Sequence, residues 1–263
     1  MPAQVDLSKL SVRQFAERFR SEMIPLSNTF SYFCASVPLS EEDLKEYLEE
    51  PVAALPPAVA AALPKISILL VPYLERSNAE RTNGQRTNTK DRAKAAAAEY
   101  VSIEKPLHGR ISAATQLSLG GETVLAFALK DQEVAEYHYR FYHLLATVLG
   151  EQWTENVETG YSRLMREELN SDVHGEVDEA SWRLKQALRR SQAAMSAKAF
   201  RTYARQSFID TLTLYLHGIC CDIDVDTGPR QLPSRYLRKR LLVLQELFPA
   251  PHGYAVFPEQ LGS

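Results

Sequence analysis

The stretch ISAATQLSLGGETVLAFALKD, from Ile111 to Asp131, decides the fold class of this chain. Two runs rich in apolar and β-branched residues flank Gly120 and Gly121, and paired glycines at such a point are typical of a tight hairpin turn. We therefore predict two antiparallel strands near residues 112–130. This is the clearest strand pattern in the chain, and the sequence that follows it is of a different kind.

After Asp131 almost the whole sequence is typical of helices. The first helix carries an apolar stripe with helical spacing, made by Val134, Tyr137, Phe141, Leu144, Leu145 and Val148. Further helices are expected at residues 155–169, 178–195, 198–218 and 234–248. Because strands and helices are segregated along the chain, we predict an α+β fold, predominantly helical, with a small, mostly antiparallel sheet and a C-terminal helical bundle.

The N-terminal part is predicted to begin with helices. Ser11 and Gln14 match the capping-box pattern at a helix start, and Ser40, followed by acidic residues, marks a second helix. Residues 65–75, KISILLVPYLE, form a continuous apolar run with β-branched residues, which indicates a buried strand.

Residues 76–93 interrupt this part of the chain. They are polar and show no periodicity, so we expect a mobile surface loop there. The part before the loop holds too few predicted strands to fold alone. We therefore expect one domain over residues 1–263.

The composition narrows the possible functions. Hydrophobic residues make up 45% and the formal charge is −3, so no global basic field attracts nucleic acid. No run approaches the ~18 apolar residues that span a bilayer, and the first residues lack the apolar core of a signal peptide. Three cysteines, two of them adjacent, argue against a disulfide framework. We expect a cytoplasmic protein without membrane association.

Metal-binding residue types are concentrated in residues 214–233, LYLHGICCDIDVDTGPRQLP. His217 and Cys221 are four residues apart and share a helix face, and thiolate with imidazole suits zinc. Cys220 and Asp222 adjoin them. The alternative is a buried helix end followed by a short acidic strand, because the spacing matches neither a four-ligand zinc motif nor an EF-hand calcium loop.

A second pattern involves the helix that contains HLLATVLG. Zincin peptidases place HExxH on a helix, where both histidines bind zinc and the glutamate activates water. The segment resembles that helix in outline: His143 matches the first histidine, while Leu144 and Thr147 replace the glutamate and the second histidine. The order of elements is similar to that of the zincin peptidases that cleave phage repressors. Those peptidases have a third zinc ligand on a downstream helix, and Glu176 and Glu179 of this chain would match that helix. The resemblance implies a zincin-like fold with an incomplete motif.

A third group, NSDVHGEVDEASW, has His174, Glu176 and Asp178 in a turn between two helices. A histidine beside carboxylates can act as an acid–base centre. Asp178 can instead cap the following helix. For a hydrolytic site we would choose His174 and Glu176 together with His143.

Three functions remain open from the sequence. No complete catalytic motif is present, so a binding or regulatory module for another protein is our first prediction. The first alternative is a divergent, zinc-dependent hydrolase with His143, His174 and Glu176 as catalytic residues and His143, His174, His217 and Asp222 as metal ligands. The second is nucleic-acid binding by arginines on the late helices. Outside the hydrolase alternative, no cofactor is expected.

Overall fold

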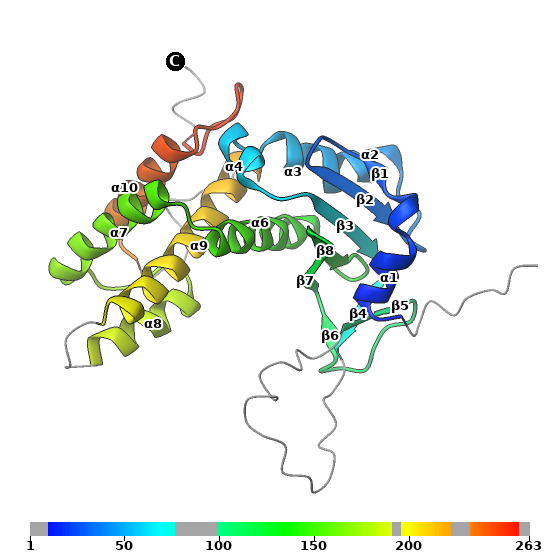
Figure 1. Cartoon of the computed structure of the whole chain (residues 1–263), viewed down its shortest axis with the longest axis horizontal. Helices are drawn as coiled ribbons and strands as arrows, with labels where there is room; N and C mark the ends of the chain where they lie inside the picture. The colour runs from blue at the N-terminus through cyan, green and yellow to red at the C-terminus, as the bar shows by residue number, and fades with distance from the viewer. Residues whose placement is uncertain (1–9, 77–98, 191–195, 222–231, 258–263) are drawn as a thin grey trace, which may run out of the picture. The chain divides into compact units, whose positions relative to one another are not determined.

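The computed structural model describes residues 10–76, 99–190, 196–221 and 232–257. The chain divides into two compact units, which are described separately. The sheet unit holds residues up to 44 and residues 64–137, and the helical unit holds residues 45–63 and those from 138 onward. The α+β class is confirmed (Figure 1). Of the loop predicted at residues 76–93, the structure describes only Arg76.

The main sheet of the sheet unit has five strands in the order β1-β2-β3-β8-β7. Their bounds are β1 Ile24–Pro25, β2 Phe30–Cys34, β3 Ile66–Val71, β7 Ala114–Leu119 and β8 Glu122–Ala128. Strand β3 pairs in parallel with both β2 and β8, whereas both edge strands are antiparallel. The prediction of a mostly antiparallel sheet is therefore wrong for this sheet, which is mixed. Hairpin patterns reveal only the antiparallel neighbours, since parallel partners lie far apart in sequence.

The predicted hairpin is confirmed as β7 and β8. Leu119 pairs with Glu122, so Gly120 and Gly121 alone form the turn. Their φ angles are +58° and +87°, a left-handed conformation that glycine adopts without steric cost. Two consecutive residues with positive φ are what a type I′ turn requires, and this turn matches the twist of the strands.

The core of the sheet unit forms around β3, in which all six residues are buried. A fully apolar run is what a strand between two parallel partners needs, because both of its faces are covered. Helix α1, Val12–Arg18, contributes buried Val12 and Phe15 to this core. The predicted capping box is present, with Ser11 and Gln14 each hydrogen-bonded to the other's backbone N–H.

Smaller elements complete the sheet unit. A three-stranded antiparallel sheet has the order β5-β4-β6. Its strands, together with the short helices η2 and α2, have the bounds β4 Tyr73–Arg76, β5 Glu99–Ser102, β6 Ile111–Ser112, η2 Arg20–Glu22 and α2 Glu41–Leu44. Ser40 caps the helical segment that starts at α2, through its hydroxyl and the Asp43 carboxylate. A proline commonly ends a helix, but this segment continues past Pro51, because Pro51 falls in the first turn of α3 and needs no N–H partner there.

The helical unit confirms the predicted C-terminal bundle. Its elements are η3 Lys45–Glu49, α3 Glu50–Ala53, α4 Pro57–Ala62, α6 Val134–Glu151, α7 Glu155–Asn170, α8 Glu179–Arg190, α9 Ala197–Cys221 and α10 Ser234–Leu247. Helix α6 starts in the sheet unit and belongs to the helical unit from His138 onward. Helix α9 contacts α7, α8 and α10 (Figure 1). Most of its residues are buried.

Close helix packing in this unit depends on Gly150 near the end of α6. A Cβ atom there would lie 2.7 Å from the side chain of Ile209 on α9, so glycine allows the two helices to approach. None of the described helices is long and apolar enough to cross a membrane.

Candidate functional site

Four buried charges lie at the centre of the helical unit. Arg240 of α10 donates to Glu168 of α7 through Nε at 3.1 Å and to Glu176, ahead of α8, through Nη1 at 2.7 Å. Lys185 of α8 donates to Glu176 through Nζ at 2.9 Å. The side chains of Lys185, Glu176 and Arg240 are wholly buried, and Glu168 is 2% exposed. The two positive and two negative charges cancel, as a buried cluster requires.

Hydroxyl groups complete the hydrogen bonding around Glu176. Tyr203 of α9 donates to one oxygen at 2.5 Å, and Ser207 donates to the other at 3.3 Å. Ser207 also accepts a bond from Arg240 at 2.8 Å. Glu176, Arg240 and Lys185 therefore each have more than one hydrogen-bond partner, and both oxygens of Glu168 accept bonds from Arg240. Such hydrogen bonding is the condition for tolerating buried ions.

Burial by itself raises the pKa of the Glu176 carboxyl. Arg240 and Lys185 outweigh burial and lower that pKa to about 2. Glu176 thus stays ionised and ties α8, α9 and α10 together. Its predicted catalytic role stays a prediction.

The structure brings two of the predicted histidines to one aromatic side chain. His143 of α6 and His217 of α9 both contact the ring of Tyr139, with centroid distances of 6.4 Å and 5.9 Å. His143 Nδ1 also lies 3.4 Å from the Thr213 hydroxyl on α9. The Tyr139 hydroxyl donates to Asp178 at 3.2 Å.

The other predicted site residues have different surroundings. His174 packs edge-to-face against Trp182, with ring centroids 5.0 Å apart. Asp178 accepts a bond from the Ala180 N–H at 3.3 Å, so it caps α8 as expected. Asp222 and the acidic stretch after it lie outside the described residues.

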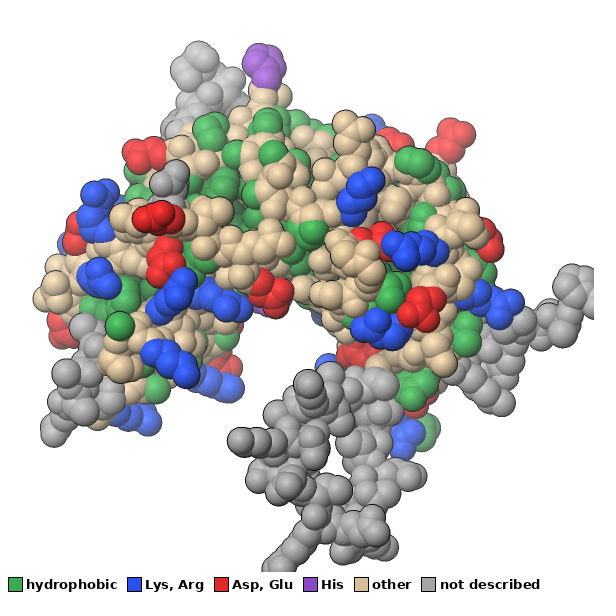
Figure 2. Space-filling view, in the orientation of Figure 1, with side chains coloured by type: hydrophobic (Ala, Val, Ile, Leu, Met, Phe, Trp, Pro, Cys, Tyr) green, Lys and Arg blue, Asp and Glu red, His purple; other side chains and the backbone are tan. Residues whose placement is uncertain are grey.

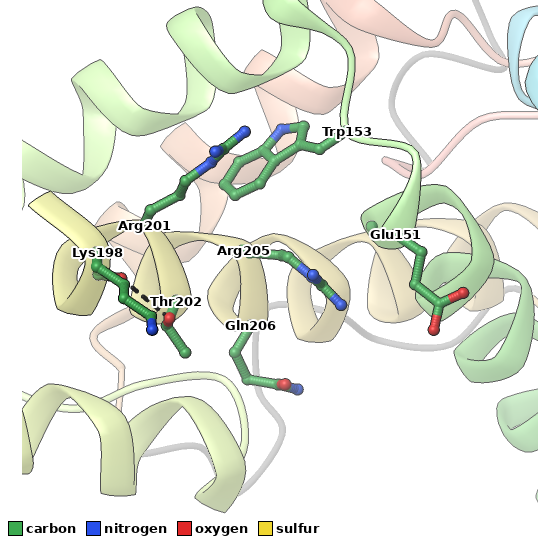
Figure 3. A pocket seen from close by; sticks show the side chains of 8 residues that line it. Glu151, Trp153, Lys198, Arg201, Thr202, Arg205 and Gln206 are labelled. Carbon is green, nitrogen blue, oxygen red and sulfur yellow. Dashed lines mark hydrogen bonds between the residues drawn. The ribbon is translucent and has the colours of Figure 1, made fainter.

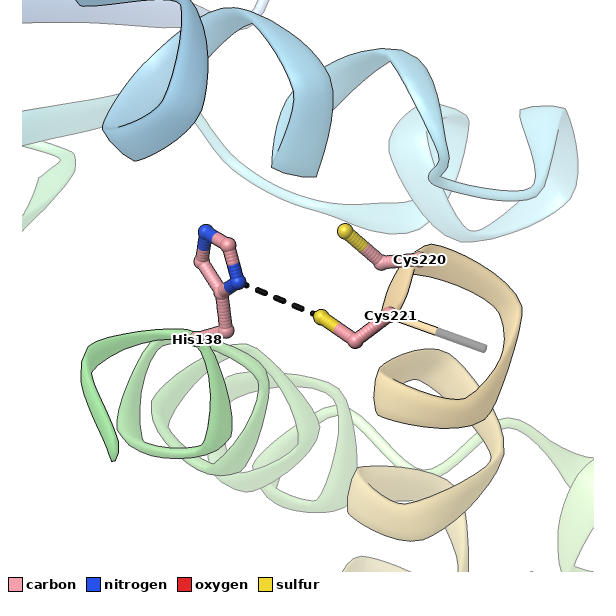
Figure 4. A group of neighbouring side chains, drawn as sticks. All are labelled: His138, Cys220 and Cys221. Atoms are coloured by element: carbon pink, nitrogen blue, oxygen red, sulfur yellow. Dashed lines mark hydrogen bonds between the residues drawn. The ribbon is translucent and has the colours of Figure 1, made fainter. Parts of the chain in front are cut away.

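Among the described residues, one group has metal-ligating atoms close enough for a shared ion: His138, Cys220 and Cys221 (Figure 4). It contains none of His143, His174 and His217. The sequence pattern pointed to both cysteines but not to His138, which is 83 positions from Cys221. No local spacing could reveal this partner, because tertiary packing of α6 against α9 creates the contact.

The two cysteines affect each other's protonation. A hydrogen bond from the Cys221 thiol lowers the pKa of Cys220 to about 7, although burial raises it. The same bond, together with burial, raises the pKa of Cys221.

The helical unit also has two adjoining surface hollows of about 470 Å³ and 730 Å³. Trp153 and Arg201 line both, so we treat the hollows as one groove and call it the α7–α9 groove. Its other lining residues are Gly150, Glu151, Glu155, Glu158, Thr159, Ser162, Arg163, Arg166, Ala197, Lys198, Phe200, Thr202, Arg205 and Gln206.

Helix α9 supplies the basic wall of the groove. Lys198, Arg201 and Arg205 are spaced by three and four residues, which places them along one helix face. Figure 3 shows these side chains extending from α9, with Trp153 coming from the segment after α6. Trp153 stacks on Phe208, with centroids 5.7 Å apart and an angle of 18° between the rings. This packing holds one aromatic side chain in place at the junction of the two hollows.

The charges in the groove differ in how far they are neutralised. Arg201 forms an ion pair with Glu158 at 2.7 Å, and the guanidinium of Arg166 lies over the Phe200 ring at 4.6 Å. Within the described part of the chain, Lys198 and Arg205 have no carboxylate within ion-pair distance. These two exposed cations are therefore available to an anionic group.

No family model, curated protein or solved structure matches this chain.

Proposed function

We propose that the helical unit is a protein-binding module whose α7–α9 groove receives an acidic segment of a partner protein. The observation that carries the proposal is the pair Lys198 and Arg205, which lies beside Trp153 in an open groove. Arginine and tryptophan are among the residue types that contribute most to binding energy at protein interfaces. Carboxylates of a partner would pair with the two cations, and its apolar side chains would pack on the indole.

The balance of charges favours a peptide over a nucleic acid. Five cationic and three acidic residues line the groove, with Glu151, Glu155 and Glu158 among the cations. Figure 2 shows acidic side chains lying among basic ones on the visible face of the helical unit. A continuous phosphate backbone would meet repulsion at each glutamate, whereas a peptide can place carboxylates only opposite Lys198 and Arg205.

The test is fluorescence anisotropy with three labelled probes: a glutamate peptide in which two glutamates are separated by leucines, a lysine peptide in which lysines replace those glutamates, and a twenty-nucleotide oligo-dT. We expect the glutamate peptide to bind and the lysine peptide not to bind. The double variant Lys198→Glu/Arg205→Glu should weaken glutamate-peptide binding at least tenfold, because both open cations are reversed.

The matched control is Lys65→Glu/Arg190→Glu, which makes the same change in net charge at exposed residues outside the groove. This control should bind like the wild type. Equal losses in both double variants would show that net charge alone acts, and the proposal would fail. Stronger binding of oligo-dT, falling steeply with salt, would favour the nucleic-acid alternative.

The hydrolase alternative has one observation in its favour, the approach of His143 and His217 to Tyr139. It predicts that zinc is lost from the protein on His143→Gln or His174→Gln. Retention of metal in both variants would remove the sequence-based ligand set.

A further inference from the structure

We propose that His138, Cys220 and Cys221 bind a zinc ion. His138 lies in the second turn of α6, and the two cysteines are the last residues of α9. The imidazole nitrogen and both sulfurs lie within 4.8 Å of one another, and Nδ1 of His138 is 3.2 Å from the Cys221 sulfur. In tetrahedral zinc sites, bond lengths of about 2.0–2.3 Å place nitrogen and sulfur ligands roughly 3.6 Å apart. The three atoms need only small adjustments to surround one ion.

The hydrogen bond on the far side of His138 prepares its ring for this role. Nε2 lies 2.9 Å from the backbone oxygen of Glu46 in η3. A carbonyl oxygen only accepts, so Nε2 carries the proton and Nδ1 presents its lone pair toward Cys221. Metal-binding histidines in proteins are commonly oriented by such a bond from the second ring nitrogen to a carbonyl. His138 is 7% exposed, so its ring is also held by packing.

The charge balance favours a divalent, thiophilic ion. Two thiolates and a neutral imidazole carry a charge of −2, which a zinc ion neutralises. The complex therefore has no net charge, and partial burial of it costs little free energy. Binding releases the two thiol protons to solvent. The carboxylate of Glu50 in α3 acts on both cysteines electrostatically, and its negative charge further favours a cation there.

The geometry disfavours the other use of adjacent cysteines, a disulfide between them. Both are free and helical, and neighbouring side chains on a helix point about 100° apart. Three protein ligands leave a fourth zinc position, as in sites that hold water or an exogenous ligand. Because the ligands come from α6 and α9, the ion would join the start of one helix to the end of the other.

The experiment is titration of the purified, tag-free full chain with Co²⁺, followed by competition with Zn²⁺. We expect one equivalent of cobalt to give the thiolate charge-transfer and visible bands of a tetrahedral site, and zinc to abolish them. Cys220→Ser, Cys221→Ser and His138→Gln should each weaken cobalt binding at least tenfold. Zinc should raise the Tm of the wild type but not of these variants.

The third cysteine supplies the matched control. Cys34 lies in β2 of the sheet unit, and Cys34→Ser should keep the cobalt spectrum and the Tm shift unchanged. Circular dichroism of each variant shows whether it is folded. Absence of thiolate bands in the wild type overturns the proposal, as does their persistence in folded Cys220→Ser and Cys221→Ser. Loss with His217→Gln but not with His138→Gln would show that the imidazole is wrongly assigned.

Discussion

Two regions of the helical unit contain the same types of charged residue, but the charges have different roles in the two regions. In the buried cluster, Arg240 is wholly enclosed between Glu168 and Glu176. In the α7–α9 groove, the side chain of Arg201 is 63% exposed and pairs with a single carboxylate, Glu158. Removing one partner leaves an uncompensated charge in the first region, whereas water replaces the lost partner in the second. Burial, and not residue type, therefore separates an ion pair that holds the fold from one that can be exchanged for a ligand.

The largest expected effect comes from Arg240→Met, which leaves two buried carboxylates without their main partner. We expect the free energy of unfolding to fall by about 3–5 kcal/mol, the range for breaking a buried ion pair. Urea denaturation followed by circular dichroism measures it. A loss below about 1 kcal/mol would mean that the cluster is not what holds these helices together.

The next largest difference between the two regions should appear in the stability of the protein at acidic pH. The pKa of Glu176 is about 2 in the folded protein, against 4.5 ordinarily, so the unfolded chain takes up this proton first as the pH falls. The contribution of Glu176 is thus complete above pH 4.5 and is lost on going down to about 2. This difference corresponds to a contribution on the order of 3 kcal/mol.

The check is a comparison of unfolding free energies from pH 6 to pH 2 in the wild type and in Glu176→Gln. The variant should be less stable at neutral pH and should show a shallower fall in acid. Glu167→Gln, which removes an exposed carboxylate from α7, should keep most of the wild-type pH dependence. Parallel acid curves for wild type and Glu176→Gln would contradict the assignment.

A smaller effect is expected for Tyr203→Phe, which deletes one hydroxyl that donates to Glu176. Hydrogen bonds to buried charged groups contribute about 1.5–3 kcal/mol, so we expect a loss of about 2 kcal/mol in the free energy of unfolding. Tyr236→Phe is the control and should change little, because the hydroxyl of Tyr236 on α10 accepts an exposed hydrogen bond from Arg235. If Tyr203→Phe left the free energy of unfolding unchanged, the remaining donors would fully satisfy the hydrogen-bonding capacity of Glu176.

The smallest effect on stability is expected in the groove. Arg201→Ala removes an exposed ion pair, so the free energy of unfolding should change by about 0.5 kcal/mol or less. Binding of the glutamate peptide should nevertheless weaken, because Arg201 lines both hollows. A large loss of stability with unchanged binding would reverse the contrast between the regions.

Local patterns were sufficient for much of the fold. The hairpin at Gly120 and Gly121, the capping box at Ser11 and the bundle after Asp131 each depend on neighbours a few residues apart. The parallel pairing of β3 was not predictable in this way, since its partners are brought together only by long crossovers. The zincin-like fold and the hydrolytic role of His143 stay predictions.

The candidate sites depend on contacts between distant residues. Glu176 was chosen as a titratable group in a turn, but Arg240, 64 positions later, determines its ionisation. The sequence did not identify Trp153 as a site residue, because a single tryptophan between two helices has no distinctive spacing. Its stacking on Phe208 and its place in the groove follow from the packing of the helices.

By itself, the sequence predicted the hairpin at Gly120 and Gly121, the capped first helix and the late helices, and it placed two adjacent cysteines just before Asp222. The tertiary structure alone decided which arginine is buried, and that His138 rather than His217 directs a ring nitrogen at Cys221. The physical reason is the range of the forces involved. Capping, turn geometry and helical periodicity act within a few residues, whereas burial and ligand geometry arise only when helices pack together.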